Sequence, residues 1–176
     1  MSGFTVLLSE GDLRSDGFAN EVVRIVANHL GLLPDLVDAL TSDDPSVRGH
    51  AADAIEKVSR THPGEVAPFL SLTRSARSDD VPVIRWHMAM VPGHLSVIPL
   101  TSPKAGRTLL ALLRDPGPFV RSWAIASLCI IAKRSARYAP SIARAVSGIT
   151  SNASPAVAKR ARTAVHALGQ PQRRAA

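Results

Sequence analysis

The chain has 176 residues, of which 45% are hydrophobic and 20% are charged, and it contains a single cysteine. This composition excludes a disordered chain, a membrane-embedded chain and an internal disulfide framework, and it predicts one soluble domain. The net charge of +7 is unevenly distributed, because residues 1–80 carry 13 acidic and 7 basic side chains whereas residues 81–176 carry 14 basic side chains and one acidic one. We therefore expect an acidic N-terminal half and a basic C-terminal half.

Neither a secretory signal nor a membrane span is expected. The first ten residues carry no base, and residues 4–8 form an apolar run that is too short for export. The most apolar segment, residues 124–132, is less than half as long as the about 20 residues that a spanning helix needs. The sequence thus predicts a cytoplasmic protein.

The first predicted helix covers residues 18–30, where apolar residues recur at helical spacing, and residues 4–9 can form a short partner for it. We interpret residues 1–31 as a degenerate N-terminal capping repeat. Terminal units of stacked repeats are atypical because one of their faces meets water.

Four prolines mark an internal repeat. Pro45, Pro82, Pro118 and Pro155 are 37, 36 and 37 residues apart, and apolar residues recur at helical spacing before and after each of them. Proline suits the first position of a helix, where its missing N–H has no partner to lose. The pattern predicts helical hairpins at about 32–62, 63–99, 103–137 and 138–168, within one domain (1–168) that is followed by a flexible basic tail (169–176).

One dipeptide interrupts this pattern. Pro92 and Gly93 fall inside the expected second helix of the second repeat. Proline removes a helical hydrogen bond and glycine adds flexibility, so the sequence predicts a kink or a break there.

The Asp-Pro-Ser-Val-Arg turn at residues 44–48 and its three counterparts, each followed by small apolar residues, resemble the HEAT repeat of the armadillo-like superfamily. More closely, residues 51–60, 83–89 and 120–124 are similar to small bacterial HEAT-like repeat proteins of undefined activity. The resemblance covers about residues 32–168 and implies an all-α, right-handed α-solenoid. It further implies a non-enzymatic scaffold that binds protein partners, with no catalytic residue and no cofactor.

The resemblance also implies a structural ladder. In HEAT-like stacks, an arginine at one repeat position pairs with an aspartate six residues before it in the repeat and ties helices across the turns. The matching residues are Arg48, Asp79, Arg85, Asp115 and Arg121. Asn152 and Ala158 stand at these places in the fourth repeat, where the ladder should end.

A second set of residues lies close after the ladder arginines and is expected on the concave face, where solenoids usually bind. This candidate ridge comprises His50, Asp53, Trp86, His87, Trp123, Lys159 and Arg160. The alternative is that the two tryptophans pack between helices.

The same residues also bear on metal binding and catalysis. His50 and His87 would sit on neighbouring helices about 10 Å apart, and the chain has neither a His-Glu dipeptide nor paired cysteines, so no metal site is predicted. This also excludes the iron-binding pattern of HEAT-like hydroxylases. Asp53 beside Trp86 and Trp123 is similar, in composition only, to the HEAT-like DNA glycosylases, which leaves a repair-type enzyme as a third hypothesis.

The basic half supplies the competing binding hypothesis, because from residue 116 to the end the chain holds ten bases and no acid. Such a surface attracts polyanions, so nucleic acid bound through its backbone is the main alternative to a protein partner. The candidate residues are Lys133, Arg134, Arg137, Arg144 and Arg162. Two other interpretations stay open. The arginines can serve only to keep the chain soluble, or the acidic half of one copy can bind the basic half of a second copy, head to tail.

Overall fold

The computed structural model describes residues 3–15, 17–71, 76–98, 102–149 and 153–169. Within these ranges the regular structure is entirely helical. The α-helices are α1 (Gly3–Leu8), α2 (Ala19–Asn28), α3 (Leu33–Asp38), α4 (Pro45–Thr61), α5 (Pro63–Val66), α7 (Pro82–Leu95), α8 (Ser102–Leu112), α9 (Pro118–Arg134), α10 (Ala139–Ser147) and α11 (Pro155–Gly169). Short 3-10 turns are η1 (Leu30–Leu32), η2 (Ala39–Thr41), η3 (Ala67–Phe69), η4 (Ala76–Ser78) and η5 (Ala136–Tyr138).

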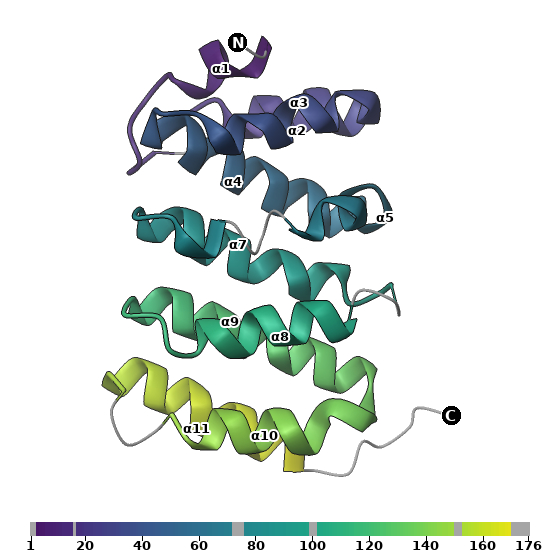
Figure 1. The fold of residues 1–176 in the computed structure, drawn as a ribbon, viewed down its shortest axis with the longest axis vertical. Coiled ribbons are helices and arrows are strands. Elements are labelled where there is room, and N and C mark those ends of the chain that lie inside the picture. Colours follow the sequence, from purple (N-terminus) through teal and green to yellow (C-terminus); the bar gives the residue numbers. More distant parts are fainter. Residues whose placement is uncertain (1–2, 16, 72–75, 99–101, 150–152, 170–176) are drawn as a thin grey trace.

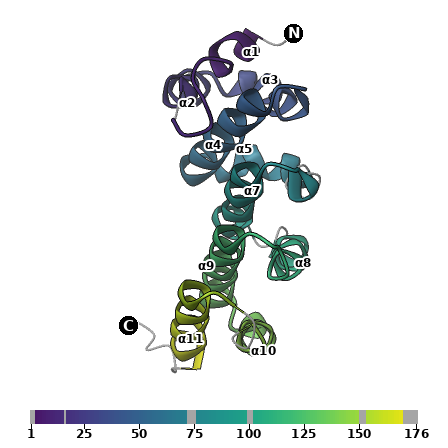
Figure 2. The ribbon, with the colours of Figure 1, turned by 90° about the vertical axis from the view of Figure 1, so that its left-hand side faces the viewer.

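The helices stack into a rod with the N-terminus at one end and the C-terminus near the other (Figure 1). Successive hairpins place α3, α5, α8 and α10 in one layer and the longer α4, α7, α9 and α11 in the other, as the side view in Figure 2 shows. The helices α1 and α2 form a cap on α4. The predicted fold class, an all-α solenoid, is confirmed. No helix in the described ranges is both long and apolar enough to cross a membrane.

The repeat prolines are the first residues of α4, α7, α9 and α11. The residues before Pro45, Pro82 and Pro118 have extended backbone angles, as the ring of a following proline requires. Asp44 caps α4, since its Oδ1 accepts a hydrogen bond from the Ser46 amide at 2.8 Å.

The buried side chains form two hydrophobic clusters that meet at α7. Met88, Val91 and Leu95 of α7 join the cluster of the N-terminal half, whereas Ala89, on another face of α7, joins that of the C-terminal half. The repeat that contains α7 therefore buries apolar surface against its neighbours on both sides, which is the source of stability in a stacked array.

The helix α7 continues through Pro92 and Gly93 to Leu95, so of the expected kink or break the break does not occur. The glycine has a packing reason. A Cβ atom on Gly93 would lie 3.0 Å from the Cβ and 3.1 Å from the Cα of Ser127 in α9. The buried Ser127 hydroxyl donates to the Ala89 carbonyl oxygen at 2.8 Å, so α7 and α9 touch backbone to backbone where the two hydrophobic clusters meet.

The cap is fastened to α4 by His50. The imidazole is 3% exposed, with Nδ1 2.8 Å from the carbonyl oxygen of Leu8 and Nε2 3.1 Å from that of Asp12. Gly17 lets the loop pass over this ring, because its φ of +47° favours glycine and a Cβ there would lie 2.8 Å from the His50 Cε1. His50 is thus an interior residue, contrary to its expected place on the candidate ridge.

The close approach of α7 and α9 can be tested with Gly93→Ala. We expect a loss of about 1–3 kcal/mol in the free energy of unfolding, because the added methyl group meets the Ser127 backbone. Gly106→Ala in α8 is the matched control. None of the described atoms lies within 4 Å of a Cβ at that position, and alanine there should stabilise the helix by about 0.5–1 kcal/mol. Urea denaturation measures both, and equal effects would contradict the packing role of Gly93.

Candidate functional site

The ladder residues form two equivalent connections between consecutive repeats. Arg48 Nε donates to Asp79 Oδ2 at 2.9 Å, and Arg85 Nε donates to Asp115 Oδ2 at 2.8 Å. In each case Nη2 also reaches the other carboxylate oxygen, at 3.3 Å. The aspartate comes from the following repeat, so the predicted pairing of each arginine with the aspartate six residues before it was wrong. The ion pairs run from one hairpin to the next.

Each of these arginines also holds its own turn. Nη1 of Arg48 donates to the carbonyl oxygens of Ser42 and Asp43, and Nη1 of Arg85 to those of Asp79 and Asp80. Burial opposes ionisation of Asp79, but hydrogen bonds from the Arg48 guanidinium and the Val81 amide outweigh it and lower the pKa of this carboxyl group.

The third arginine differs. Arg121 Nε is buried and has no hydrogen-bond acceptor among the described residues, although the same atom binds a carboxylate in Arg48 and Arg85. Asn152, which stands at the position of the missing aspartate, lies outside the described residues.

Asp115→Asn tests the ladder. The side chains of Arg85 and Asp115 are only 10% and 6% exposed, so loss of the charge should cost about 3–5 kcal/mol in the free energy of unfolding. Asp80→Asn is the matched control, because the Asp80 carboxylate is 87% exposed and should contribute less than about 1 kcal/mol through its contact with Arg48. Similar losses in the two variants would show that the ladder pair does not tie the repeats together.

The candidate ridge is only partly on the surface. Asp53 is 8% exposed and accepts a hydrogen bond from Lys57 Nζ at 2.7 Å, so its carboxylate is not available to a substrate. This removes the group on which the glycosylase-type hypothesis depended. The half-buried Trp86 packs edge to face on Phe119, with ring centroids 5.3 Å apart.

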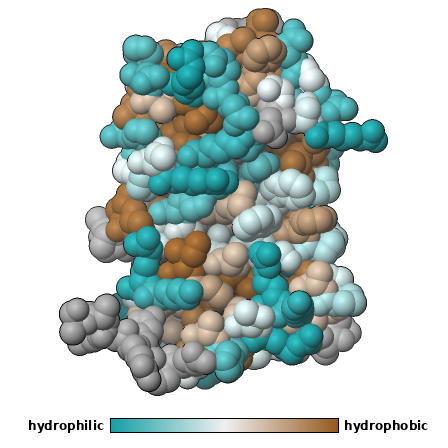
Figure 3. Space-filling view, turned by 180° about the vertical axis from the view of Figure 1, so that it is seen from behind, coloured by the Kyte–Doolittle hydropathy of each residue, from teal (hydrophilic) through white to brown (hydrophobic). Residues whose placement is uncertain are grey.

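The C-terminal part of the ridge remains together. The guanidinium of Arg160 lies 5.3 Å from the ring centroid of Trp123 and donates to the Ser122 carbonyl oxygen, and Lys159 beside it is exposed. Phe119, which is 64% exposed, belongs to this surface and was missed by sequence reasoning. Figure 3 shows the face formed by the second-layer helices as a mixture of hydrophilic and hydrophobic side chains and not as one apolar patch.

A polar network lies between α4 and α7. Glu56, which is fully buried, receives two hydrogen bonds from Arg60 at 2.8 and 2.6 Å. Across the helix interface, His87 Nδ1 is 3.8 Å from Asp53 Oδ1 and His94 Nε2 is 3.5 Å from Glu56 Oε1.

Three of these residues, Asp53, Glu56 and His87, bring one potential ligand atom each to within 4.8 Å of one another. Sequence reasoning considered His50 with His87 and missed this set, although the spacing of three residues between Asp53 and Glu56 could have indicated it. Lys57 and Arg60 already neutralise the two carboxylates, so a cation would have to compete with both. The charge balance favours a stabilising role in the α4–α7 interface.

Burial lowers the pKa of both His87 and His94 below the ordinary value of 6.5, because removal from water disfavours the charged imidazolium. The nearby carboxylates Asp53 and Glu56 act in the opposite direction without cancelling the effect. The two imidazoles are therefore neutral in the folded chain at neutral pH.

A pH dependence follows. Below pH 6.5 the unfolded chain binds protons at these imidazoles that the folded chain does not, so the free energy of unfolding should fall as the pH is lowered through 6.5 towards the folded-state values. Substituting both residues, His87→Asn and His94→Asn, should flatten this dependence in thermal melts recorded across that range. The exposed His166→Asn serves as the control, and a slope unchanged by the double substitution would contradict the assignment.

The structure brings only part of the predicted polyanion set together. Lys133, Arg134 and Arg137 are exposed at the C-terminal end of α9 and in η5, and Arg137 also lies over the Tyr138 ring at 5.4 Å. Arg137 and Arg144 line two hollows that share Leu110, whereas Arg162 projects from α11 and lines neither.

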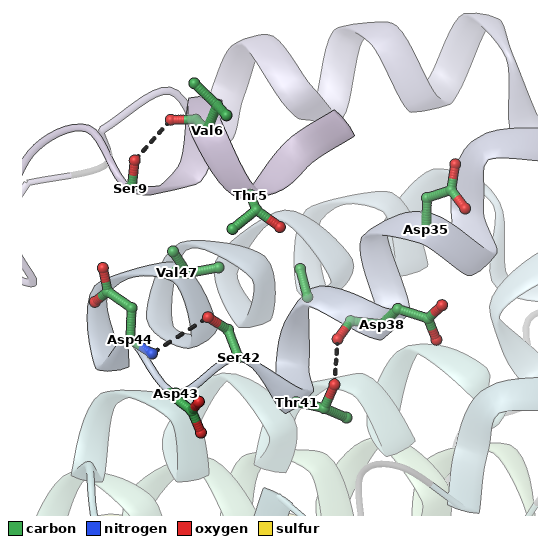
Figure 4. A pocket seen from close by; sticks show the side chains of 11 residues that line it. Thr5, Val6, Ser9, Asp35, Asp38, Thr41, Ser42, Asp43, Asp44 and Val47 are labelled. Carbon is green, nitrogen blue, oxygen red and sulfur yellow. Dashed lines mark hydrogen bonds between the residues drawn. The ribbon is translucent and has the colours of Figure 1, made fainter. Parts of the chain in front are cut away.

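An acidic pocket lies at the N-terminal end of the rod, between α1, α3 and the start of α4 (Figure 4). Its volume is ≈ 820 Å³, and Asp35, Asp38, Asp43 and Asp44 line it without any basic side chain among the described residues. All four aspartates are exposed, and the hydrophobic Val6 at the rim is 65% exposed. The pocket therefore offers carboxylates and some apolar surface to a cationic group.

The fold is a solenoid of stacked helical hairpins that carries charged pockets. Two engineered proteins solved by X-ray crystallography share the fold with TM-scores of 0.68 and 0.70 at 16% and 19% identity, and each comparison covers 94% of this chain and 77% or 79% of the other. A designed armadillo repeat protein in complex with the peptide (KR)4 is similar with a TM-score of 0.67 and 20% identity over 87% of this chain and 72% of that protein. No protein-family model and no curated protein matches the sequence.

Proposed function

We propose that the chain is a non-enzymatic scaffold that binds segments of protein partners, and that its N-terminal end takes a basic segment. The single observation that carries this proposal is the acidic pocket, in which four aspartates line ≈ 820 Å³ without a balancing base among the described residues. A Lys or Arg side chain in such a pocket gains charge-assisted hydrogen bonds, and Arg can bind a carboxylate in a bidentate manner.

Two further features support a protein partner. A designed protein of the same fold was solved with the basic peptide (KR)4, so this architecture can hold a segment of that chemistry. The open face of the second layer presents Phe119 beside Trp86, and Arg160 over Trp123. Aromatic and arginine side chains are the residue types that carry most binding energy in protein interfaces.

Nucleic acid is the weaker candidate for this chain, because only Arg137 and Arg144 of the basic residues proposed for it line adjoining hollows, and apolar side chains form much of the remaining walls. Head-to-tail association of two copies remains a special case of the same proposal, in which the basic segment belongs to a second molecule.

The proposal can be tested by titrating a fluorescein-labelled (KR)4 peptide and recording fluorescence anisotropy. We expect saturable binding that weakens with added salt and that falls by about tenfold in the double variant Asp35→Asn, Asp38→Asn. Glu65→Gln, which removes an exposed acid outside the pocket, is the matched control and should bind as the wild type does.

Two outcomes count against the proposal. If the peptide does not bind at low salt while a short DNA duplex does, the chain is a nucleic-acid binder. If the control variant loses as much affinity as the pocket variant, the attraction is a diffuse effect of net charge and the pocket is not a site.

A further inference from the structure

The first-layer helices α8 and α10 are neighbours towards the C-terminal end of the rod (Figure 2). A groove lies between these two helices, and its charge is opposite to that of the acidic pocket. It consists of two adjoining hollows of ≈ 560 and ≈ 330 Å³ that share Leu110 as a lining residue. Among the described residues, no acidic side chain lines either hollow. The groove is thus basic and apolar, whereas the pocket at the other end of the rod is acidic.

The larger hollow is lined by three arginines, Arg114, Arg121 and Arg144, which come from the end of α8, the start of α9 and the last turns of α10. Arg114 and Arg144 are exposed, so both can turn towards a ligand. Three guanidinium groups around one hollow, with no carboxylate in the part of its lining that the structure describes, produce a strongly positive potential.

Arg121 indicates what kind of anion fits. It occupies the same repeat position as Arg48 and Arg85, whose Nε and Nη2 atoms bind an aspartate side-on at 2.8–3.3 Å. Its own Nε is buried and has no acceptor among the described residues. Among the described residues, this guanidinium therefore lacks the carboxylate that neutralises Arg48 and Arg85, and its charge acts on the hollow that it lines.

The remaining walls favour a protein segment over a nucleic-acid backbone. Leu110, which is 38% exposed, together with Leu113 and Ile149 makes an apolar wall beside the arginines, and Tyr138 and Ile142 extend it in the smaller hollow. A phosphodiester backbone has no side chain for these walls, whereas a peptide with alternating apolar and acidic residues matches both.

We propose that the α8–α10 groove binds an acidic, apolar segment of a protein partner, with a Glu or Asp carboxylate of that segment beside the Arg121 guanidinium where it lines the larger hollow. The proposal rests on the scaffold function proposed above and adds the chemistry of a second segment. Arg114 and Arg144 supply further charge at the rim, and Leu110 contacts the apolar side chains of the segment.

The test uses the full chain and a labelled octapeptide of alternating leucine and glutamate, with an octapeptide of alternating leucine and lysine as the control ligand. We expect the Leu-Glu peptide to bind and the Leu-Lys peptide not to bind this groove. Arg121→Gln should weaken the Leu-Glu complex by at least about tenfold, because it removes one partner of a charge-assisted pair. Arg162→Gln on α11, outside the groove, is the matched control and should leave the affinity unchanged.

A second variant tests the groove at its rim. Arg144 lines the larger hollow and is exposed, so Arg144→Gln should weaken the Leu-Glu complex without disturbing the fold. This variant keeps the test decisive if Arg121→Gln fails to fold.

Three results would overturn the proposal. The first is that the Leu-Glu peptide does not bind the wild type at low salt, and the second is that the Arg121 and Arg162 variants lose equal affinity for this peptide. The third is that a short DNA duplex binds in a manner that depends on Arg121 while the peptide does not bind. The (KR)4 titration on the same preparations separates the two proposals. Binding of (KR)4 without the Leu-Glu peptide leaves the scaffold function standing and removes only the groove.

Discussion

The register between consecutive hairpins of this solenoid is set, at two turns, by a single guanidinium. Arg48 and Arg85 each bind the carbonyl oxygens of their own turn with Nη1 and a carboxylate of the next turn with Nε and Nη2. Because the planar fork of arginine fixes the direction of its donors, the pair sets the distance and the angle between consecutive hairpins. Apolar burial supplies the driving force for stacking, while these pairs fix the register in which the layers meet.

Within the described ranges, the arginine–aspartate pairs are incomplete at both ends of the molecule, and the unpaired charge has the opposite sign at each end. At the N-terminal end Ser42 stands where the later repeats have Asp79 and Asp115, and the neighbouring aspartates are left to face solvent around a pocket. Towards the C-terminal end Arg121 keeps the position of the guanidinium without a carboxylate in the described residues. The negative charge of the N-terminal half is therefore concentrated at the acidic pocket, and the positive charge of the C-terminal half at the α8–α10 groove.

Features with a local cause could be predicted from the sequence. The prolines at 45, 82, 118 and 155 identified the starts of the four long helices, because proline fits the first turn of a helix wherever it occurs. The shared position of the arginines likewise pointed to the ladder, although the spacing alone did not show that each arginine pairs with the following repeat.

Features that depend on the meeting of distant segments could not be predicted in this way. His50 lies under a loop that begins about forty positions earlier in the chain, with Nδ1 2.8 Å from the Leu8 carbonyl oxygen. The network of Glu56 with His94 arises only once α4 and α7 are packed, and the role of Gly93 depends on Ser127 in another repeat. Helical periodicity gives the face of a residue but not the element that covers it.

The hairpin-to-hairpin direction of the ladder also defines the unit by which such a rod can be lengthened. A segment that begins at Asp79 and ends at Arg114 contains the carboxylate for the arginine before it and, in Arg85, the guanidinium for the aspartate after it. Duplicating this segment in tandem leaves every added guanidinium and carboxylate matched, because Arg85 of the first copy meets Asp79 of the second and Arg85 of the second copy meets Asp115. The rod can therefore be lengthened by a whole repeat without leaving an added ladder residue unpaired.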